Sequence, residues 1–107
     1  MVYYLYIINC VGTDYYKIGV SDRPKSRVVT LQTGCPYCLE LVKKYAFKTK
    51  LEAYAAEAVT HRVLNDHLVH GEWFKLKYFK LIRWEHITKG NRQQKEYAYR
   101  ARLLSQQ

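Results

Sequence analysis

The sequence predicts an α+β domain in which helices pack on a small antiparallel sheet. Near the start, short runs of β-branched and aromatic residues are separated by turn residues, which is typical of strands joined in hairpins. Longer segments with helix start and stop signals follow these runs. The resulting order is strand, strand, helix, strand, helix, and then an extended piece and further helices, which favours an α+β fold.

The first hairpin is predicted from residues 3–8 and 15–20. Both runs are rich in Tyr, Ile and Val, the residue types that favour strands. Between them, "NCVGTD" supplies Gly12 and Asp14, which are turn residues. The two strands are therefore expected to pair antiparallel.

Four helices are predicted from their end signals. The first has Pro24 in its opening turn, where a missing N–H costs no hydrogen bond, and Ser21 or Asp22 as its cap. Thr49 and Glu52 form a capping box at the start of the second. The predicted helices are residues 24–31, 50–67, 76–87 and 92–104, and further strand-like segments are residues 39–48 and 72–76.

The positive charge is concentrated in the last third of the chain. The net charge is +9, and residues 75–107 carry nine Lys or Arg but only two Asp or Glu. Such a field attracts a polyanion, and because no basic helix has bulky apolar anchors for a membrane, DNA is the expected partner. The length fits one core domain, residues 1–88, followed by a basic helical extension, residues 89–107.

No membrane or export segment is expected. No apolar run approaches the roughly 20 residues that span a bilayer. The first residues, "MVYYLYIIN", have no basic region before the apolar run and are typical of a strand. The prediction is therefore an intracellular protein, in the cytoplasm or nucleus of a host cell, that is not secreted.

Three cysteines, Cys10, Cys35 and Cys38, leave a zinc site as an alternative. An odd number of cysteines in an intracellular chain argues against a disulfide framework. The "CPYC" segment has the spacing of half a zinc site, but no second C-x-x-C is present to complete it. An ordinary turn is the favoured interpretation, and a zinc-binding interaction protein is kept as an alternative function.

Glu57 and His61 are the first candidates for chemistry. They are four residues apart on the second long predicted helix and fall in the stripe that also carries Ala58 and Leu64. A carboxylate on a core-facing stripe costs free energy unless it is paired or binds a metal. Helix periodicity alone leaves a structural Glu–His pair and a functional pair equally open.

The predicted hairpin adds further polar groups. Tyr4 and Tyr6 share one face of the first strand, and Lys17 lies on its partner. Arg27 faces back toward the hairpin if Val28 and its helical neighbours face the core. Each residue alone has an ordinary structural explanation. Together with Glu57 they offer a hydroxyl or amine for a proton, a guanidinium for a phosphate, and a carboxylate for a hard metal ion.

The ordered motifs of the chain resemble the GIY-YIG endonuclease superfamily. "YLYII" is followed by "KIGVS", and Arg27 comes eight residues after Gly19. "LQTG", the Glu57–His61 pair and "GEWF" resemble the branch found in phages and large DNA viruses. The resemblance covers roughly residues 1–76, and it is the series of motifs, rather than any single one, that is specific.

The resemblance implies a fold, an activity and a metal. The fold is a compact three-stranded antiparallel sheet flanked by helices. The activity is metal-dependent hydrolysis of a DNA phosphodiester with one Mg²⁺ or Mn²⁺ ion and no small-molecule cofactor. The residues that match the family's motifs are the tyrosine Tyr6, the second-motif residue Lys17, the motif glycine Gly19, the phosphate-contacting Arg27 and the metal-binding Glu57.

The sequence also departs from the family pattern. Tyr4 stands where the first motif has glycine, and Leu31 where many relatives have histidine or tyrosine. No late asparagine follows Glu57, so His61 and Glu72 of "GEWF" are expected to substitute for it. These departures keep open a DNA-binding module of the same fold that cuts weakly or not at all.

Two further expectations concern the proton and the DNA. Tyr6 is the preferred base, with its pKa lowered by Arg27 and the metal, and Lys17 positions the attacking water. Lys17, with its pKa lowered by burial, and His61 are the alternative bases. Most affinity for DNA is expected from backbone phosphates, with little sequence preference. The expected phosphate-binding residues are Lys75, Lys77, Lys80, Arg83, Arg92, Lys95, Arg100 and Arg102.

Overall fold

The structure, a computed structural model, describes residues 2–88, and residues 89–107 lie outside the described part. A five-stranded antiparallel sheet forms the centre, in the order β3-β1-β2-β5-β4. The strands are β1 (Tyr3–Cys10), β2 (Tyr15–Ser21), β3 (Leu39–Phe47), β4 (Leu68–His70) and β5 (Trp73–Lys75). The helices are α1 (Pro24–Gln32), α2 (Lys50–Val63) and α3 (Trp84–Thr88), with single 3₁₀ turns at Asn65–His67 and Phe79–Leu81.

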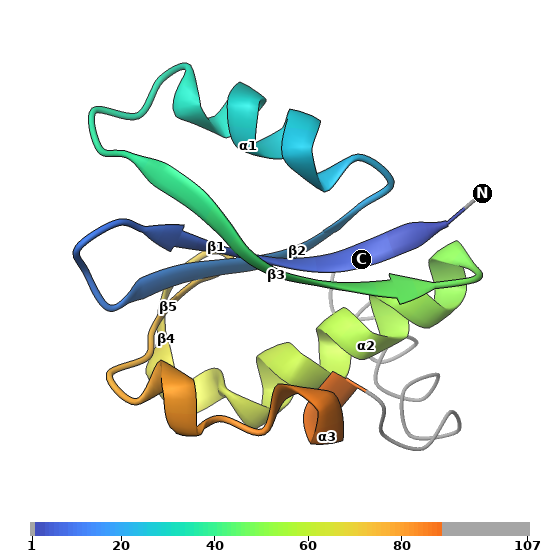
Figure 1. Cartoon of the computed structure of the whole chain (residues 1–107). Coiled ribbons are helices and arrows are strands. Elements are labelled where there is room, and N and C mark those ends of the chain that lie inside the picture. Colours follow the sequence, from blue (N-terminus) through green and yellow to red (C-terminus); the bar gives the residue numbers. More distant parts are fainter. Residues whose placement is uncertain (1, 89–107) are drawn as a thin grey trace.

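Helices cover both faces of the sheet. Helix α1 lies on one face, and helices α2 and α3 lie on the other (Figure 1). The α1 face carries Tyr6 and Ile8 of β1, and the α2 face carries the alternate residues Leu5 and Ile7. This arrangement confirms the predicted α+β class.

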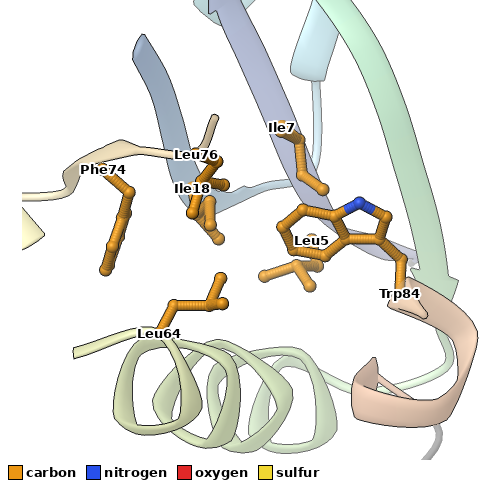
Figure 2. Close-up of a cluster of buried hydrophobic side chains, with 7 residues drawn as sticks. All are labelled: Leu5, Ile7, Ile18, Leu64, Phe74, Leu76 and Trp84. Carbon is orange, nitrogen blue, oxygen red and sulfur yellow. The ribbon is translucent and has the colours of Figure 1, made fainter. Parts of the chain in front are cut away.

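The main core lies on the α2 face. Leu5, Ile7 and Ile18 of the sheet meet Leu64 and Trp84, and Figure 2 shows these side chains packed between the strands, α2 and α3. Trp84 is 1% exposed and closes this core at the end of the described chain. Burial of this apolar surface is the main stabilising contribution to the fold.

The strands predicted over residues 3–8, 15–20 and 39–48 are present, and the strand-like segment 72–76 contains β5. The sheet has five strands rather than the three that the family resemblance implies, and β4 was not predicted. Strands β4 and β5 form a short hairpin that extends the sheet beyond β2. Both consist of three residues, so they are too short to give a clear alternating pattern. Gly71, at φ 57°, forms the turn between them in the left-handed region that favours glycine.

Several predicted helix boundaries are corrected by the structure. Helix α2 begins as predicted, with the Thr49 side chain accepting a hydrogen bond from the Glu52 N–H. It ends at Val63 rather than His67, because the following residues tighten into a 3₁₀ turn. Helix α1 has no side-chain cap, since the Ser21 hydroxyl instead accepts from the N–H of Arg23, at 2.9 Å.

The predicted helix over residues 76–87 is wrong. This segment is not one continuous helix: it contains the 3₁₀ turn at Phe79–Leu81 and, at its end, most of the short helix α3. Its apolar residues are held by tertiary packing: the Phe79 ring stacks on Tyr16 with centroids 4.2 Å apart. No helix within residues 2–88 is long and apolar enough to cross a membrane.

Candidate functional site

The site is built around Gly19 on the α1 face of the sheet. Gly19 lies opposite Tyr6 in the β1–β2 ladder, so both face the same side. A Cβ at Gly19 would stand 2.6 Å from Cζ of Tyr6 and 2.8 Å from Oε2 of Glu72. Only glycine allows these two polar side chains to meet over the strand.

Helix α1 brings Arg27 to Tyr6. Val28 and Leu31 pack toward the sheet, so the neighbouring Arg27 stands at the edge of this contact and hydrogen-bonds the Tyr6 side chain. Tyr6 is 2% exposed. The two residues expected to act together on a phosphate are therefore in direct contact.

Burial and Arg27 act in opposite directions on the pKa of Tyr6, and Arg27 lowers it as expected. Burial of the hydroxyl raises its pKa above the ordinary value of 10.0, and this outweighs the lowering by Arg27. The charge of Glu72 raises the Tyr6 pKa further. Tyr6 is thus a protonated hydrogen-bonding group at neutral pH, which makes it a poor base.

Helix α2 and the β4–β5 turn bring three potential metal ligands together. Glu57 and His61 are one turn apart on α2, and Glu72 follows Gly71 in the turn. One ligand atom from each of the three residues lies within 4.8 Å of the others. Glu57 is 2% exposed, whereas His61 and Glu72 are half-buried.

His61 hydrogen-bonds the edge of β2. Its Nε2 lies 2.9 Å from the carbonyl oxygen of Ile18, beyond the point where β5 stops pairing with β2. A carbonyl can only accept, so Nε2 carries the proton and Nδ1 holds the ring's lone pair in the neutral form. Burial lowers the His61 pKa below 6.5, and the charge of Lys17 lowers it too, whereas the Ile18 hydrogen bond and Glu72 raise it.

Lys17 lies on the same face of β2 as Gly19, two residues away. It pairs in register with Trp73 of β5, and its ammonium lies 5.9 Å from the centroid of the Trp73 ring. Lys17 is half-buried, and its charge is felt by His61. The hairpin lysine is therefore part of the site rather than a solvated edge residue.

The cluster fits a divalent metal ion. Two carboxylates with ligand oxygens this close repel each other, and a cation between them compensates their charge. The carboxylate oxygens of Glu57 and Glu72 suit Mg²⁺ or Mn²⁺, and the His61 imidazole adds a potential nitrogen ligand. Within residues 2–88 the cysteines Cys10, Cys35 and Cys38 are free and belong to no such group.

A family model, the T5orf172 domain, matches residues 3–89. The chain belongs to this family. The T5orf172 domain is phage-associated and falls in the GIY-YIG/HNH-like nuclease class, which supports a nuclease or DNA-binding role. No curated protein and no solved structure matches the chain significantly.

This T5orf172 domain has a cationic hollow beside Arg27, which the sequence did not indicate. Its volume is about 370 Å³, and Lys50 and Tyr54 of α2 line it together with Ser21 and Asp22. Lys50 is the first residue of α2, next to its cap, so the sequence pattern explained it as part of a helix start. Lys50 and Arg27 line the same hollow although their helices cover opposite faces of the sheet (Figure 1).

The expected DNA-binding residues of this T5orf172 domain are described only in part. Lys75, Lys77, Lys80 and Arg83 are exposed, and Lys75 lies opposite Tyr15 on the α1 face. The other four, Arg92, Lys95, Arg100 and Arg102, and the predicted helix that carries them lie outside the described residues.

Proposed function

We propose that this protein is a metal-dependent DNA endonuclease of the GIY-YIG type that hydrolyses a phosphodiester bond with one divalent ion, Mg²⁺ or Mn²⁺. The observation that supports this most is the Glu57–His61–Glu72 cluster beside Tyr6 and Arg27. A carboxylate pair for a cation and a guanidinium for a phosphate both lie near Gly19, through Glu72 and through the Tyr6 side chain that Arg27 hydrogen-bonds. The match to the T5orf172 domain supports the same class of activity.

Glu57 and Glu72 would hold the metal ion. When bound, the ion would supply Lewis-acid stabilisation of the charge that develops on the leaving oxygen. Glu57 is the fixed ligand because α2 holds it in the protein interior, and Glu72 closes the site from the β4–β5 turn.

Arg27 would bind the non-bridging oxygens of the scissile phosphate. A guanidinium offers two parallel N–H donors to a phosphate, and these contacts stabilise the transition state. Its hydrogen bond with the Tyr6 side chain orients it. The Tyr6 hydroxyl would in turn donate a hydrogen bond to the phosphate. Lys50, which shares the cationic hollow with Arg27, would bind a further phosphate of the same strand.

His61 would accept the proton of the attacking water. Its Nε2 is engaged by the Ile18 carbonyl, so Nδ1 is free to take a proton when the water oxygen attacks phosphorus. The bond from phosphorus to the leaving oxygen breaks, and that oxygen takes a proton from solvent. Lys17 would position the water. We place His61 rather than Tyr6 in the role of base, because burial raises the pKa of the Tyr6 hydroxyl.

The test is nicking of a supercoiled plasmid with Mg²⁺ and with Mn²⁺. Wild type should nick, Glu57→Gln should not, and Arg27→Ala should be slower by about 10²–10³-fold, the usual effect of losing a transition-state donor. Glu40→Gln is the matched control for Glu57→Gln, and Arg62→Ala is the matched control for Arg27→Ala. Each control removes the same charge as its partner variant, but from an exposed side chain outside the site.

A second measurement separates the metal ligands from the base. Mn²⁺ affinity should be lost in Glu57→Gln but kept in His61→Gln, whereas both variants should lose nicking. If wild type is inert on duplex, branched and single-stranded DNA but still binds it, the protein is a DNA-binding module of this family and the proposed chemistry is wrong.

A further inference from the structure

An apolar groove of about 500 Å³ lies on the α1 face, beyond the C-terminal end of α1. Three separate segments form it: the β1–β2 hairpin, the loop between α1 and β3, and the β4–β5 hairpin. Its wall is mostly aromatic and aliphatic, from Tyr15, Tyr37, Leu39, Val69 and Trp73. Tyr37 is 66% exposed and Val69 is 54% exposed, so this apolar surface faces solvent.

The groove is continuous with the candidate site. Residues 15, 17, 19 and 21 alternate onto the α1 face of β2 and span about 20 Å. Tyr15 lines the groove, Lys17 and Gly19 belong to the site, and Ser21 lines the cationic hollow. Trp73 joins groove and site directly, because it lines the groove and has the Lys17 ammonium over its ring.

The charge around the groove complements a nucleic acid. The Lys17 ammonium lies over the ring of Trp73, which lines the groove, and Lys75 faces the same side from opposite Tyr15. A nucleotide combines an anion with a flat apolar ring, and aromatic side chains flanked by cations bind this combination. An apolar peptide would gain nothing from the cations.

We propose that this groove binds the base of an unpaired nucleotide next to the phosphate held at the site. The base stacks on Trp73, Tyr15 or Tyr37, while its phosphate lies near Lys17. In a duplex the faces of a base are covered by its neighbours, so a base must leave the stack to enter such a groove. The substrate class is therefore DNA with unpaired bases beside the cleaved bond, such as a bulge, a flap or a single strand. This inference rests on the DNA-binding part of the proposed function.

The first test measures DNA binding by the full chain in EDTA, so that no cleavage occurs. One probe is a fully paired duplex, and the other is the same duplex with one bulged nucleotide. Wild type should prefer the bulged DNA by about 5- to 150-fold, the range that stacking of one base provides. Tyr37→Ala should lose this preference.

Tyr78→Ala is the matched control. Tyr78 is 64% exposed, nearly the same as Tyr37, but lies outside the residues that line the groove. It should keep the preference for bulged DNA. Equal binding of both probes by wild type, or equal loss in the two tyrosine variants, would overturn the proposal.

Tryptophan fluorescence gives an independent readout. The chain has two tryptophans, and Trp84 is 1% exposed in the core, so quenching by a stacked base should come from Trp73. Bulged DNA should quench wild type more strongly than paired DNA, and Trp73→Phe should abolish the difference.

The measurements also separate other occupants and other failures. Sedimentation of wild type as a dimer that Tyr37→Ala converts to a monomer would assign the groove to a second copy of the chain and overturn the proposal. Nicking without a preference for bulged DNA would refute the groove and leave the proposed chemistry intact. A preference for bulged DNA without nicking would refute the proposed chemistry and leave the groove proposal intact.

Discussion

The two faces of the sheet differ in how completely they are packed. On the α2 face, seven buried side chains form one cluster that α2 and α3 cover. On the α1 face, only Tyr6, Ile8 and Leu39 are buried in the corresponding cluster, and α1 covers part of it. The candidate site and the groove lie where this cover ends. The α2 face supplies most of the stability, and this allows the α1 face to expose polar and aromatic groups.

Ile7 and Ile8 give the largest expected effect and the most direct test of this comparison. They are adjacent on β1 and both are 0% exposed, but they point to opposite faces. Replacing a buried isoleucine by alanine costs about 2–5 kcal/mol. The loss of unfolding free energy, measured by urea unfolding, should lie near the upper end of this range for Ile7→Ala and near the lower end for Ile8→Ala. Equal costs would mean that the two faces contribute alike.

Gly19→Ala should damage the α1 face with a smaller loss of stability. The added methyl group would meet Tyr6 and Glu72, and such overpacking costs about 1–3 kcal/mol. Pushing these residues apart should also abolish nicking. Gly34→Ala is the control, because a Cβ there meets nothing within 4 Å. If Gly19→Ala nicks DNA at the wild-type rate, Gly19 is not needed for the geometry of the site.

His61 should make stability depend on pH. Its pKa is lower in the folded protein than the unfolded value of about 6.5. Between the two values the unfolded chain binds the proton more readily, so stability should fall as pH drops below about 6.5. The charged groups that face it are Lys17, Glu72 and Glu57. Unfolding of His61→Gln, followed from pH 8 downward, should show a weaker decrease, whereas exposed His86→Gln should behave as wild type.

Lys50 should contribute to DNA affinity through the cationic hollow, with a modest effect. Loss of one phosphate contact should lower the slope of log affinity against log salt by about 0.9. Lys50→Ala should show this change in duplex binding titrations. Lys48→Ala removes the same charge two residues away, from an exposed lysine that does not line the hollow, and should change the slope less. The same slope in both variants would indicate a general field rather than a contact.

The smallest expected effect concerns the attachment of α3 to the α2 face. The Tyr45 hydroxyl donates to Oε1 of Glu85 at 3.3 Å, and burial together with Glu85 raises the pKa of Tyr45 to about 12. Tyr45 is therefore protonated at neutral pH and able to donate. Tyr45→Phe should cost about 0.5–1.5 kcal/mol, and less if solvent replaces the bond. Thermal unfolding of Tyr45→Phe beside wild type measures this cost.

The parts of the fold that were predicted correctly have local signals. Thr49 begins α2 as predicted because its cap involves only residues three apart. The β1–β2 hairpin was predicted because alternation and a turn are both local patterns. The 76–87 segment was mispredicted because Phe79 and Trp84 are placed by contacts with Tyr16 and the core rather than by helix propensity.

The candidate site divides in the same way. The sequence by itself determined the Glu57–His61 pair, since helical spacing fixes their common face. It also determined that Tyr6 and Gly19 lie on adjoining strands. Only the tertiary structure decided how closely Glu72 approaches this pair, that Lys50 and Arg27 line one hollow, and that Trp73 links the site to a groove. These contacts depend on how α2 and the β4–β5 hairpin meet the edge of β2. No local pattern encodes such an approach between distant segments, for example between His61 and Ile18, which are 43 residues apart.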